Sequence, residues 1–302
     1  MLLPNVVGVV RYIYQAENCT CQSNCHLIFW LIIRPKMALE KDTKQHEKET
    51  LKAIEYYKEH CKILNCVKIV FEVMLSFIHD VIKSRRFKGE KLLEIGSGAT
   101  VHNIASASAY FPIIIQSDFV EDNREALKQW HKRESQLDWS EFLNITARLE
   151  DYESDVNEVR TKIEHRLRSN VKAVVHCDLL SDGILRLEEI PEGTGPPYDF
   201  IISMLCLEIP CNDFESFVDV LKRVNKLLKT GGGLIMGSFL EADSWYVNEK
   251  KFSKLKICLK DILKALDLSG FGHHEVKSFS RVHTEYQLQE HSGYYCVATE
   301  KL

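Results

Sequence analysis

A short apolar run at residues 91–95 carries an acid and leads directly into a glycine-rich turn. The acid is Glu94, and Gly96 and Gly98 form the turn, so the pattern is E-x-G-x-G. The dinucleotide fingerprint needs a third small residue where Val101 stands, and the triphosphate loop needs a Gly-Lys-Ser/Thr that is missing here. The turn therefore suits a ligand that has no phosphate and ends in an amino acid, with Glu94 near its cationic amino group.

Two more acids stand at the ends of apolar runs further along the chain. Asp118 ends IIIQSD about 20 residues after the turn, the separation at which a carboxylate binds a ribose diol. Dehydrogenases share this acid, so it indicates a nucleoside without saying which one. Asp178 ends VVHCD, where an adenine amino group would be reached. Any one of the three acids could be a helix N-cap. Together, at one edge of a parallel sheet, they favour S-adenosylmethionine.

Strand and helix patterns alternate along most of the chain, which predicts βαβ units and a mostly parallel sheet with helices on both faces. Two strand patterns, HHEVKSFSRVH and SGYYCVATEKL, end the chain without a helix between them and predict an antiparallel strand at one edge. The charged segment 146–170 predicts a solvated surface helix. We expect strands at 91–95, 112–117, 172–177, 198–203 and 232–239, and helices at 101–109, 121–133, 213–228 and 250–267.

The first 36 residues differ from the rest of the chain. Their apolar runs, LLPNVVGVV and HLIFWLII, are 9 and 8 residues long, which is short of a membrane span, and we find no secretory signal. Cys19, Cys21, Cys25 and His26 match no common zinc-finger spacing, so we expect no metal site. From about residue 40 to residue 85 the sequence favours helices, and Met37 opens this part of the chain.

The composition is that of an ordinary globular protein, with 45% hydrophobic residues, 27% charged residues and a net charge of −4. This balance, without a basic stripe, argues against nucleic acid as a partner. The ten cysteines contain no CxxC pair, and most stand inside apolar runs. Buried free thiols are typical of a reducing compartment, so we expect a cytoplasmic protein, and we expect it to be a monomer.

Several segments resemble the family of small-molecule N-methyltransferases whose members act on nicotinamide, phenylethanolamine and indolethylamine. They are LLEIGSGATVHNIASA, SDFVEDNREALKQW, LDWSEF, MLCLEIPCNDFESFVDVLKRVNKLLKTGGGLIMG and DSWYVNEKKF. The resemblance runs from about residue 50 to the C-terminus. It implies an α/β, Rossmann-like class I methyltransferase fold that uses S-adenosylmethionine, with a mostly parallel seven-stranded sheet, an antiparallel edge strand and helices on both faces.

The resemblance also implies a domain organisation. Residues 1–36 would form an extension outside the family, and residues 37–302 would form the methyltransferase domain. Within that domain, the helices at about 40–85 would form a lid, and residues 90–302 would form the catalytic core.

The cofactor site implied by the resemblance draws on the lid, the glycine turn and the ends of three strands. The turn would lie against the methionyl end, Asp118 would hold the ribose, and Asp178 would recognise the adenine amino group. The chain departs from the family pattern at Ala99, His102 and Lys52, where the family usually has proline, tyrosine and tyrosine. The implied cofactor residues are Tyr57, Gly96, Ser97, Gly98, Thr100, His102, Asp118, Phe119, Asn123, Asp178, Leu179 and Met204.

Two carboxylates could bind and deprotonate an amine. Glu208 follows the fourth expected strand, and Asp243 follows the fifth, so both would lie at the cofactor edge. We expect them to hold an ammonium and to take its proton, as catalytic residues, because the attacking nitrogen must present a lone pair. The alternative for Asp243 is a solvated loop acid. Leu205, Trp245 and Tyr246 would line the substrate pocket, although the two aromatic residues could equally be core.

These residues and the resemblance predict methyl transfer from S-adenosylmethionine to the nitrogen of a small amine, either an arylalkylamine, an indolethylamine or a pyridine such as nicotinamide. One alternative is a catalytically inactive protein of the same fold that binds the cofactor or a partner. Another is an oxidoreductase with a nicotinamide cofactor, which Val101 disfavours.

Overall fold

The structure, a computed structural model, describes residues 52–247, 250–281 and 290–302. These residues belong to one unit that spans residues 39–302. The expectations about the N-terminal extension and its cysteine cluster lie outside the described residues, as does the start of the helix expected from residue 40. None of the described helices combines the length and the hydrophobicity that crossing a bilayer requires.

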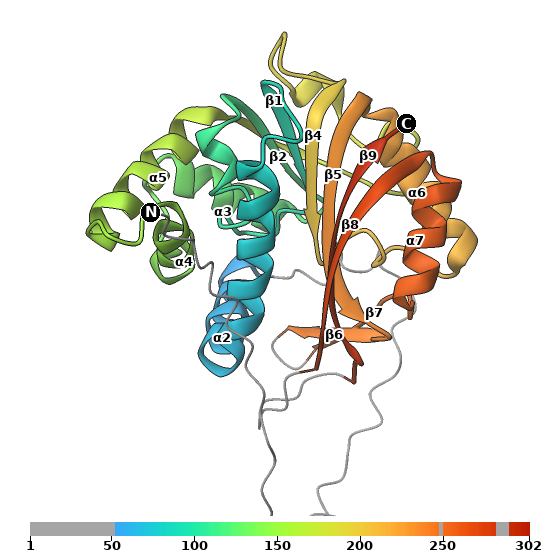
Figure 1. The fold of residues 1–302 in the computed structure, drawn as a ribbon. Coiled ribbons are helices and arrows are strands. Elements are labelled where there is room, and N and C mark those ends of the chain that lie inside the picture. Colours follow the sequence, from blue (N-terminus) through green and yellow to red (C-terminus); the bar gives the residue numbers. More distant parts are fainter. Residues whose placement is uncertain (1–51, 248–249, 282–289) are drawn as a thin grey trace, which may run out of the picture. The chain divides into compact units, whose positions relative to one another are not determined.

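A seven-stranded sheet carries the fold, with the strands in the order β3-β2-β1-β4-β5-β9-β8 (Figure 1). Strands β1 to β5 are parallel, and β9 is antiparallel to both of its neighbours. The strand order reverses between β1 and β4, and open α/β sheets bind ligands beyond the carboxyl ends of the strands at such a point. The strands span Lys91–Ile95 (β1), Ile113–Asp118 (β2), Val171–His176 (β3), Tyr198–Met204 (β4), Leu228–Leu240 (β5), Phe271–Ser280 (β8) and Gly293–Lys301 (β9).

Helices cover both faces of the sheet, with α2 to α5 on one face and α6 and α7 on the other (Figure 1). Successive strand side chains point to opposite faces, so Leu92 of β1 packs in the first core and Leu93 in the second. Both are fully buried. The helices span Ala53–Lys83 (α2), Glu121–His131 (α3), Ser140–Glu150 (α4), Val156–Asn170 (α5), Phe214–Lys226 (α6) and Leu259–Leu268 (α7).

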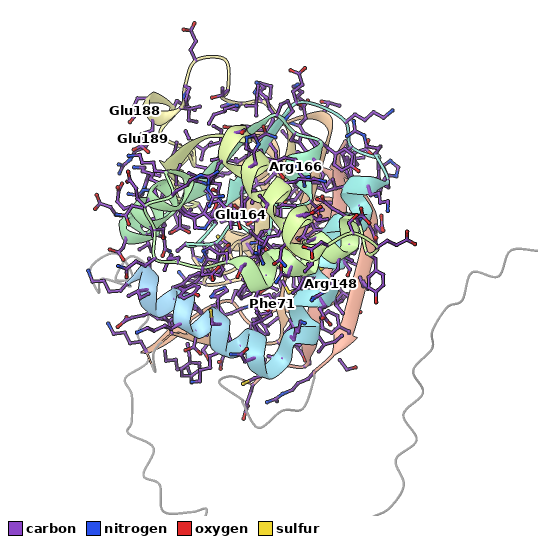
Figure 2. All side chains as sticks on the ribbon, turned by 90° about the vertical axis from the view of Figure 1, so that its left-hand side faces the viewer. Phe71, Arg148, Glu164, Arg166, Glu188 and Glu189 are labelled. Atoms are coloured by element: carbon purple, nitrogen blue, oxygen red, sulfur yellow. The ribbon has the colours of Figure 1, made fainter. Side chains whose placement is uncertain are left out.

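The first helical face is the one that Figure 2 presents, with Phe71 on α2 and Glu164 and Arg166 on α5. Phe71 meets Phe142 of α4 edge to face, with ring centroids 5.0 Å apart. The Nη2 atom of Arg166 is 2.5 Å from Oε1 of Glu150, an ion pair that ties α5 to α4. These contacts fix α2 against α4, and α2 forms one wall of the candidate active site.

The predicted alternation of strands and helices is confirmed. The predicted antiparallel strand also forms, but it does not lie at the edge of the sheet. The expected strands all form, and so do the helices near 121–133 and 213–228. The antiparallel strand is β9, which lies between β5 and β8 rather than at the edge. The edge strand is β8, because the chain forms β8 first and then returns as β9 between β8 and β5.

The expectation of a helix at 101–109 is wrong. This segment consists of turns and ends in a 3₁₀ turn at Ala107–Ala109. Hydroxyl groups bond locally to the main chain there: Thr100 Oγ1 donates to the Ser97 carbonyl at 2.8 Å, and Ser108 Oγ donates to the Ala105 carbonyl at 2.6 Å. Such local bonds compete with helix formation.

The expectations for 250–267 and 146–170 are each wrong in part. Residues 250–253 form β7 (Lys250–Ser253), which pairs with β6 (Ser244–Val247) in a two-stranded hairpin, and α7 begins only at Leu259. The charged segment is interrupted between α4 and α5. There Asp151 accepts from the Ser154 amide at 3.2 Å, and Asp155 caps α5 by accepting from the Asn157 amide at 2.8 Å. A second 3₁₀ turn spans Leu187–Glu189.

Candidate active site

A cavity of about 250 Å³, which we call the main cavity, lies beyond the carboxyl ends of the parallel strands. Its walls come from α2, the glycine turn, the end of β5, the segments after β2, β3, β4 and β8, the β6–β7 hairpin and the start of β9. A smaller cavity of about 20 Å³ lies under the turn. The predicted site residues that line the main cavity are Gly96, Gly98, Asp118, Phe119, Asn123, Asp178, Leu179, Leu205, Glu208, Trp245 and Tyr246.

The glycine turn presents bare backbone because its surroundings leave no room for side chains. Gly96 and Gly98 have φ of +71° and +59°, a region that L residues rarely adopt. A Cβ atom on Gly96 would lie 2.1 Å from Sγ of Cys206, and one on Gly98 would lie 2.6 Å from the ring of Tyr56. The Ser97 amide donates to the Ser117 carbonyl at 2.9 Å, which fixes the turn to β2.

Asp118 presents a buried carboxylate to the main cavity. Its Oδ2 accepts from the Gly98 amide at 2.7 Å, and its Oδ1 accepts from the Val120 amide at 2.9 Å and from Nδ2 of Asn123 at 3.1 Å. Burial raises the pKa of Asp118, while these donors oppose the rise. The carboxylate therefore links the turn to the start of α3 and fixes the geometry of both.

The end of β3 forms the neighbouring part of the wall. Oδ1 of Asp178 accepts from the Leu180 amide at 2.9 Å, and Leu179 and Phe119 line the cavity beside it. The Phe119 ring lies 5.6 Å from the ring of His176. The structure thus brings together the predicted ribose and adenine residues at the carboxyl ends of two adjacent strands, β2 and β3.

Glu94 lies elsewhere than expected. It lines neither cavity and is 1% exposed behind the turn. Nε2 of Gln116 donates to its Oε2 at 2.8 Å, and Nδ2 of Asn103 donates to its Oε1 at 3.3 Å. Burial raises the pKa of Glu94 to about 7. The expectation that Glu94 faces a ligand amino group is therefore wrong, because its β-strand position points it into the core.

The small cavity collects the remaining predicted residues of the methionyl end. Ser97, Thr100, His102 and Met204 line it, together with Tyr56 and His60 of α2. Burial lowers the pKa of His102 well below its usual range and that of His60 to about 4. Burial thus favours the neutral form of both imidazoles, and in that form His102 can donate a hydrogen bond to a carboxylate.

Tyr57, expected on the cofactor, lies outside both cavities. Its hydroxyl donates to the Asp138 carbonyl at 3.0 Å, and its ring meets Trp139 edge to face at 5.1 Å. Tyr56 lines both cavities instead and packs on Gly98. The correction follows from helix geometry, because consecutive residues point about 100° apart around the axis. The sequence shows two neighbouring tyrosines, but only the orientation of α2 decides which of the two lines the cavities.

Glu208 lines the main cavity with a buried cation and a hydroxyl on its carboxylate. Nζ of Lys254 donates to Oε1 of Glu208 at 2.7 Å and to Oγ of Ser238 at 2.9 Å, and the Ser238 hydroxyl donates to the same Oε1. The Lys254 and Glu208 side chains are each 3% exposed. Ser238 ends up here because it belongs to β5, next to the end of β4. We call these three residues the buried triad.

Asp243 does not join Glu208, so the predicted pair of carboxylates is wrong. Asp243 is exposed, does not line either cavity, and accepts from its neighbour Ser244 through Oδ1 at 2.7 Å. Its carbonyl accepts from the Lys254 amide at 3.0 Å, which helps to place Lys254 in the triad. Asp243 is therefore a solvated acid, and the chain reaches the cavity wall only from Trp245 onwards.

Leu205, Trp245 and Tyr246 line the main cavity as predicted. Leu205 has φ of +56°, and Trp245 stacks on Phe252 of β7 at 4.6 Å. Lys254 was missed, because KKFSKLK reads as a run of solvated lysines. Among the described residues, no group of three or more metal-binding side chains gathers anywhere.

The sequence model of the NNMT/PNMT/TEMT family matches residues 37–302. The chain belongs to this family. Nicotinamide N-methyltransferase of Homo sapiens is 31% identical over 186 residues, which cover 61% of this chain and 67% of that protein. The same enzyme of Sus scrofa is 31% identical over 219 residues, covering 71% of this chain and 78% of that protein. Indolethylamine N-methyltransferase of Oryctolagus cuniculus is 30% identical over 199 residues, covering 65% and 72% respectively.

The NNMT/PNMT/TEMT family uses S-adenosylmethionine, and the fold is the Rossmann-like fold of methyltransferases that bind it. The residues present fit such a ligand. Asp118 offers an acceptor for a diol, and Oδ1 of Asn123 is buried beside it without a partner among the described residues. In the small cavity, Nδ1 of His102 is likewise buried without a hydrogen-bond partner among the described residues. Both residues line a cavity, where a polar ligand would complete the hydrogen bonding of these two atoms.

Proposed function

We propose that the chain transfers a methyl group from S-adenosylmethionine to a nitrogen atom of a small molecule. The observation that carries the proposal is the placement of Asp118, which presents its carboxylate to the main cavity while holding the bare-backbone turn. Gly96 and Gly98 would lie against the methionyl end, and Asp178 would accept from the adenine amino group. Membership of the family supports this assignment.

S-adenosylmethionine supplies a methyl group on a positively charged sulfur. Because the charge moves from sulfur to the accepting nitrogen, the protein has little new charge to stabilise. Alignment of the two reactants and exclusion of water then provide most of the rate, and alignment alone is worth roughly 7–11 kcal/mol. The walls of the main cavity from α2 and the β6–β7 hairpin serve this purpose by enclosing the space beyond the strand ends.

Calorimetry with S-adenosylhomocysteine tests the assignment of the cofactor site. We expect Asp118→Asn to weaken binding about 10- to 100-fold, because hydrogen bonds to a charged group are worth about 1.5–3 kcal/mol. Asp219→Asn, a change at an exposed carboxylate of α6, is the matched control and should bind as the unaltered chain does. Binding of NADH in place of S-adenosylhomocysteine, or equal affinities of the two variants, would contradict the proposal.

We further propose that the protein works in the cytoplasm as a monomer and has no nucleic-acid partner. We also propose that residues 37–302 form the methyltransferase domain and that residues 1–36 are an extension outside it. The described cysteines are free thiols, and Cys177, Cys211 and Cys296 are buried, which is typical of proteins in a reducing compartment. Fractionation, sedimentation and limited proteolysis test these points.

A further inference from the structure

The helix α2, which walls the main cavity, is capped by a residue of another helix. Lys52, the N-cap residue and the first residue that the structure describes, makes no side-chain bond to the amides of the first turn. The first four N–H groups of a helix have no partner within it and need acceptors from elsewhere. Oδ2 of Asp122 supplies one of them, because it accepts from the Ala53 amide at 2.7 Å. The cap of α2 thus comes from 69 positions further along the chain.

The carboxylate of Asp122 lies at the N-terminal ends of two helices. Asp122 belongs to the first turn of α3 and bonds to the first amide of α2. Each of these helix ends carries a partial positive charge that favours a nearby anion. Asp122 also lies 4.0 Å from Nζ of Lys52, but both side chains are largely exposed, and such surface ion pairs contribute little. The bond to the Ala53 amide is therefore the stronger of these two links.

The start of α3 also holds the acid that is proposed to bind the ribose. The Val120 amide and Nδ2 of Asn123 both donate to Oδ1 of Asp118. Asp122 stands between these two donors in the sequence. A ligand bound at Asp118 would therefore fix the turn of α3 from which Asp122 reaches α2.

Tyr56 connects the capped end of α2 with both cavities. It stands one helical turn after Ala53, and residues three apart are neighbours on the surface of a helix. Its ring packs on Gly98 and lines the main and the small cavity. It also packs against an apolar cluster that includes Val120 and Val247, at the start of α3 and in the β6–β7 hairpin. The position of Ala53 therefore determines how closely α2 covers the glycine turn.

A break divides α2 into two halves that are held differently. The helix is interrupted at Val67, where φ is −140° and ψ is 44°. In the second half, Phe77, Ile78 and Val81 are buried in the first core of the protein. The first half, residues 53–66, instead walls the two cavities on one side. Its position therefore depends more strongly on the contact at its N-terminal end.

We propose that Asp122 is a positioning residue that holds the first half of α2 closed over the bound cofactor. The inference rests on the proposed function and adds a residue to its machinery. Lids move about a few residues that absorb the change in backbone angles, and the break at Val67 is suited to that role. When the bond between Asp122 and the Ala53 amide opens, the first half of α2 rotates there and uncovers the cavities. Asp122 thereby sets how fast the cofactor leaves.

Dissociation of S-adenosylhomocysteine from the full chain, followed by surface plasmon resonance, tests the proposal. Asp122→Ala should release the ligand about 5- to 30-fold faster, the effect expected when a helix loses its capping side chain. Asp122→Asn keeps an acceptor for the Ala53 amide, so it should release the ligand more slowly than Asp122→Ala and within about fivefold of the unaltered chain. Glu121→Ala, at an exposed acid in the same turn of α3, is the matched control and should leave the rate unchanged.

Hydrogen exchange with S-adenosylhomocysteine bound separates positioning from a general loss of stability. In Asp122→Ala, the amides of residues 54–66 should exchange about 5- to 30-fold faster than in the unaltered chain, whereas those of residues 72–83 should keep their rate. Faster exchange in both halves of α2 would mean that the whole protein is destabilised, and it would overturn the inference.

The remaining outcomes distinguish this inference from the proposed function. Equal release rates for Asp122→Ala and Glu121→Ala overturn the inference and leave methyl transfer standing. Release from Asp122→Asn as fast as from Asp122→Ala also overturns it, because the cap would then have no part in the effect. If the unaltered chain does not bind S-adenosylhomocysteine, the proposed function fails, and hydrogen exchange of the ligand-free variants then decides whether Asp122 holds the first half of α2.

Discussion

Glu94→Gln should make the protein more stable at alkaline pH and change little at acid pH. The carboxyl group is 1% exposed, and burial raises its pKa from 4.5 to about 7. A raised pKa in the folded state means that Glu94 favours folding fully below pH 4.5 and that this contribution is lost as the pH rises through about 7. At 1.36 kcal/mol per pKa unit, the loss amounts to about 3 kcal/mol.

Urea unfolding at several pH values between 4.5 and 8.5 measures this loss directly. The difference in unfolding free energy between Glu94→Gln and the unaltered chain should grow by about 3 kcal/mol in favour of the variant over that range. Glu134→Gln, at an exposed glutamate, should show a constant difference. A constant difference for Glu94→Gln as well would refute the reasoning and show that its hydrogen bonds from Gln116 and Asn103 offset the burial.

Three further predictions concern the cavity walls. Gly98→Ala should weaken S-adenosylhomocysteine binding at least about tenfold in calorimetry, because its Cβ would lie 2.6 Å from the Tyr56 ring. Gly193→Ala is the control: this residue has φ of +78° but no atom within 4 Å of the added Cβ, so the change should cost only about 1 kcal/mol of stability. Tyr56→Ala should raise the KM for S-adenosylmethionine, and Tyr57→Ala should lower the melting temperature with little change in that KM; the reverse pattern would restore Tyr57 to the site. Burial lowers the pKa of His60 from 6.5 to about 4, so His60 contributes stability that is fully present above pH 6.5 and is lost as the pH falls through 4. His60→Phe should therefore reduce the loss of unfolding free energy between pH 7 and pH 4 by up to about 3 kcal/mol, as measured by urea titrations.

The strands and the cofactor acids could be predicted because both depend on local pattern and on a general rule. Apolar runs of five to seven residues identify β1 to β4, and parallel strands bring their carboxyl ends to one edge. Asp118 and Asp178 therefore had to lie near the glycine turn. Glu94 departs from this scheme because it stands inside β1 rather than after it, so the alternation of the strand decides where it points.

The substrate end could be predicted only in part: Leu205, Glu208, Trp245 and Tyr246 line the cavity as expected, but Lys254 was missed and Asp243 was misplaced. One error in the secondary structure accounts for both. The charged residues from 250 onwards favour a helix, and in a helix Lys254 is a solvated lysine. The β6–β7 hairpin instead turns the chain so that Lys254 enters the cavity while Asp243 stays outside. That pairing depends on contacts between segments, such as the stacking of Trp245 on Phe252, which no local pattern contains.

The position of β9 has a consequence for synthesis of the protein. Residues 293–301 are translated after every other strand, yet β9 lies between β5 and β8, and Val297 and Ala298 are fully buried. On the ribosome, β5 therefore keeps an open hydrogen-bonding edge until these residues emerge. Because open edges pair with other chains, a translation product that stops before residue 293 should aggregate rather than persist as a partly folded enzyme.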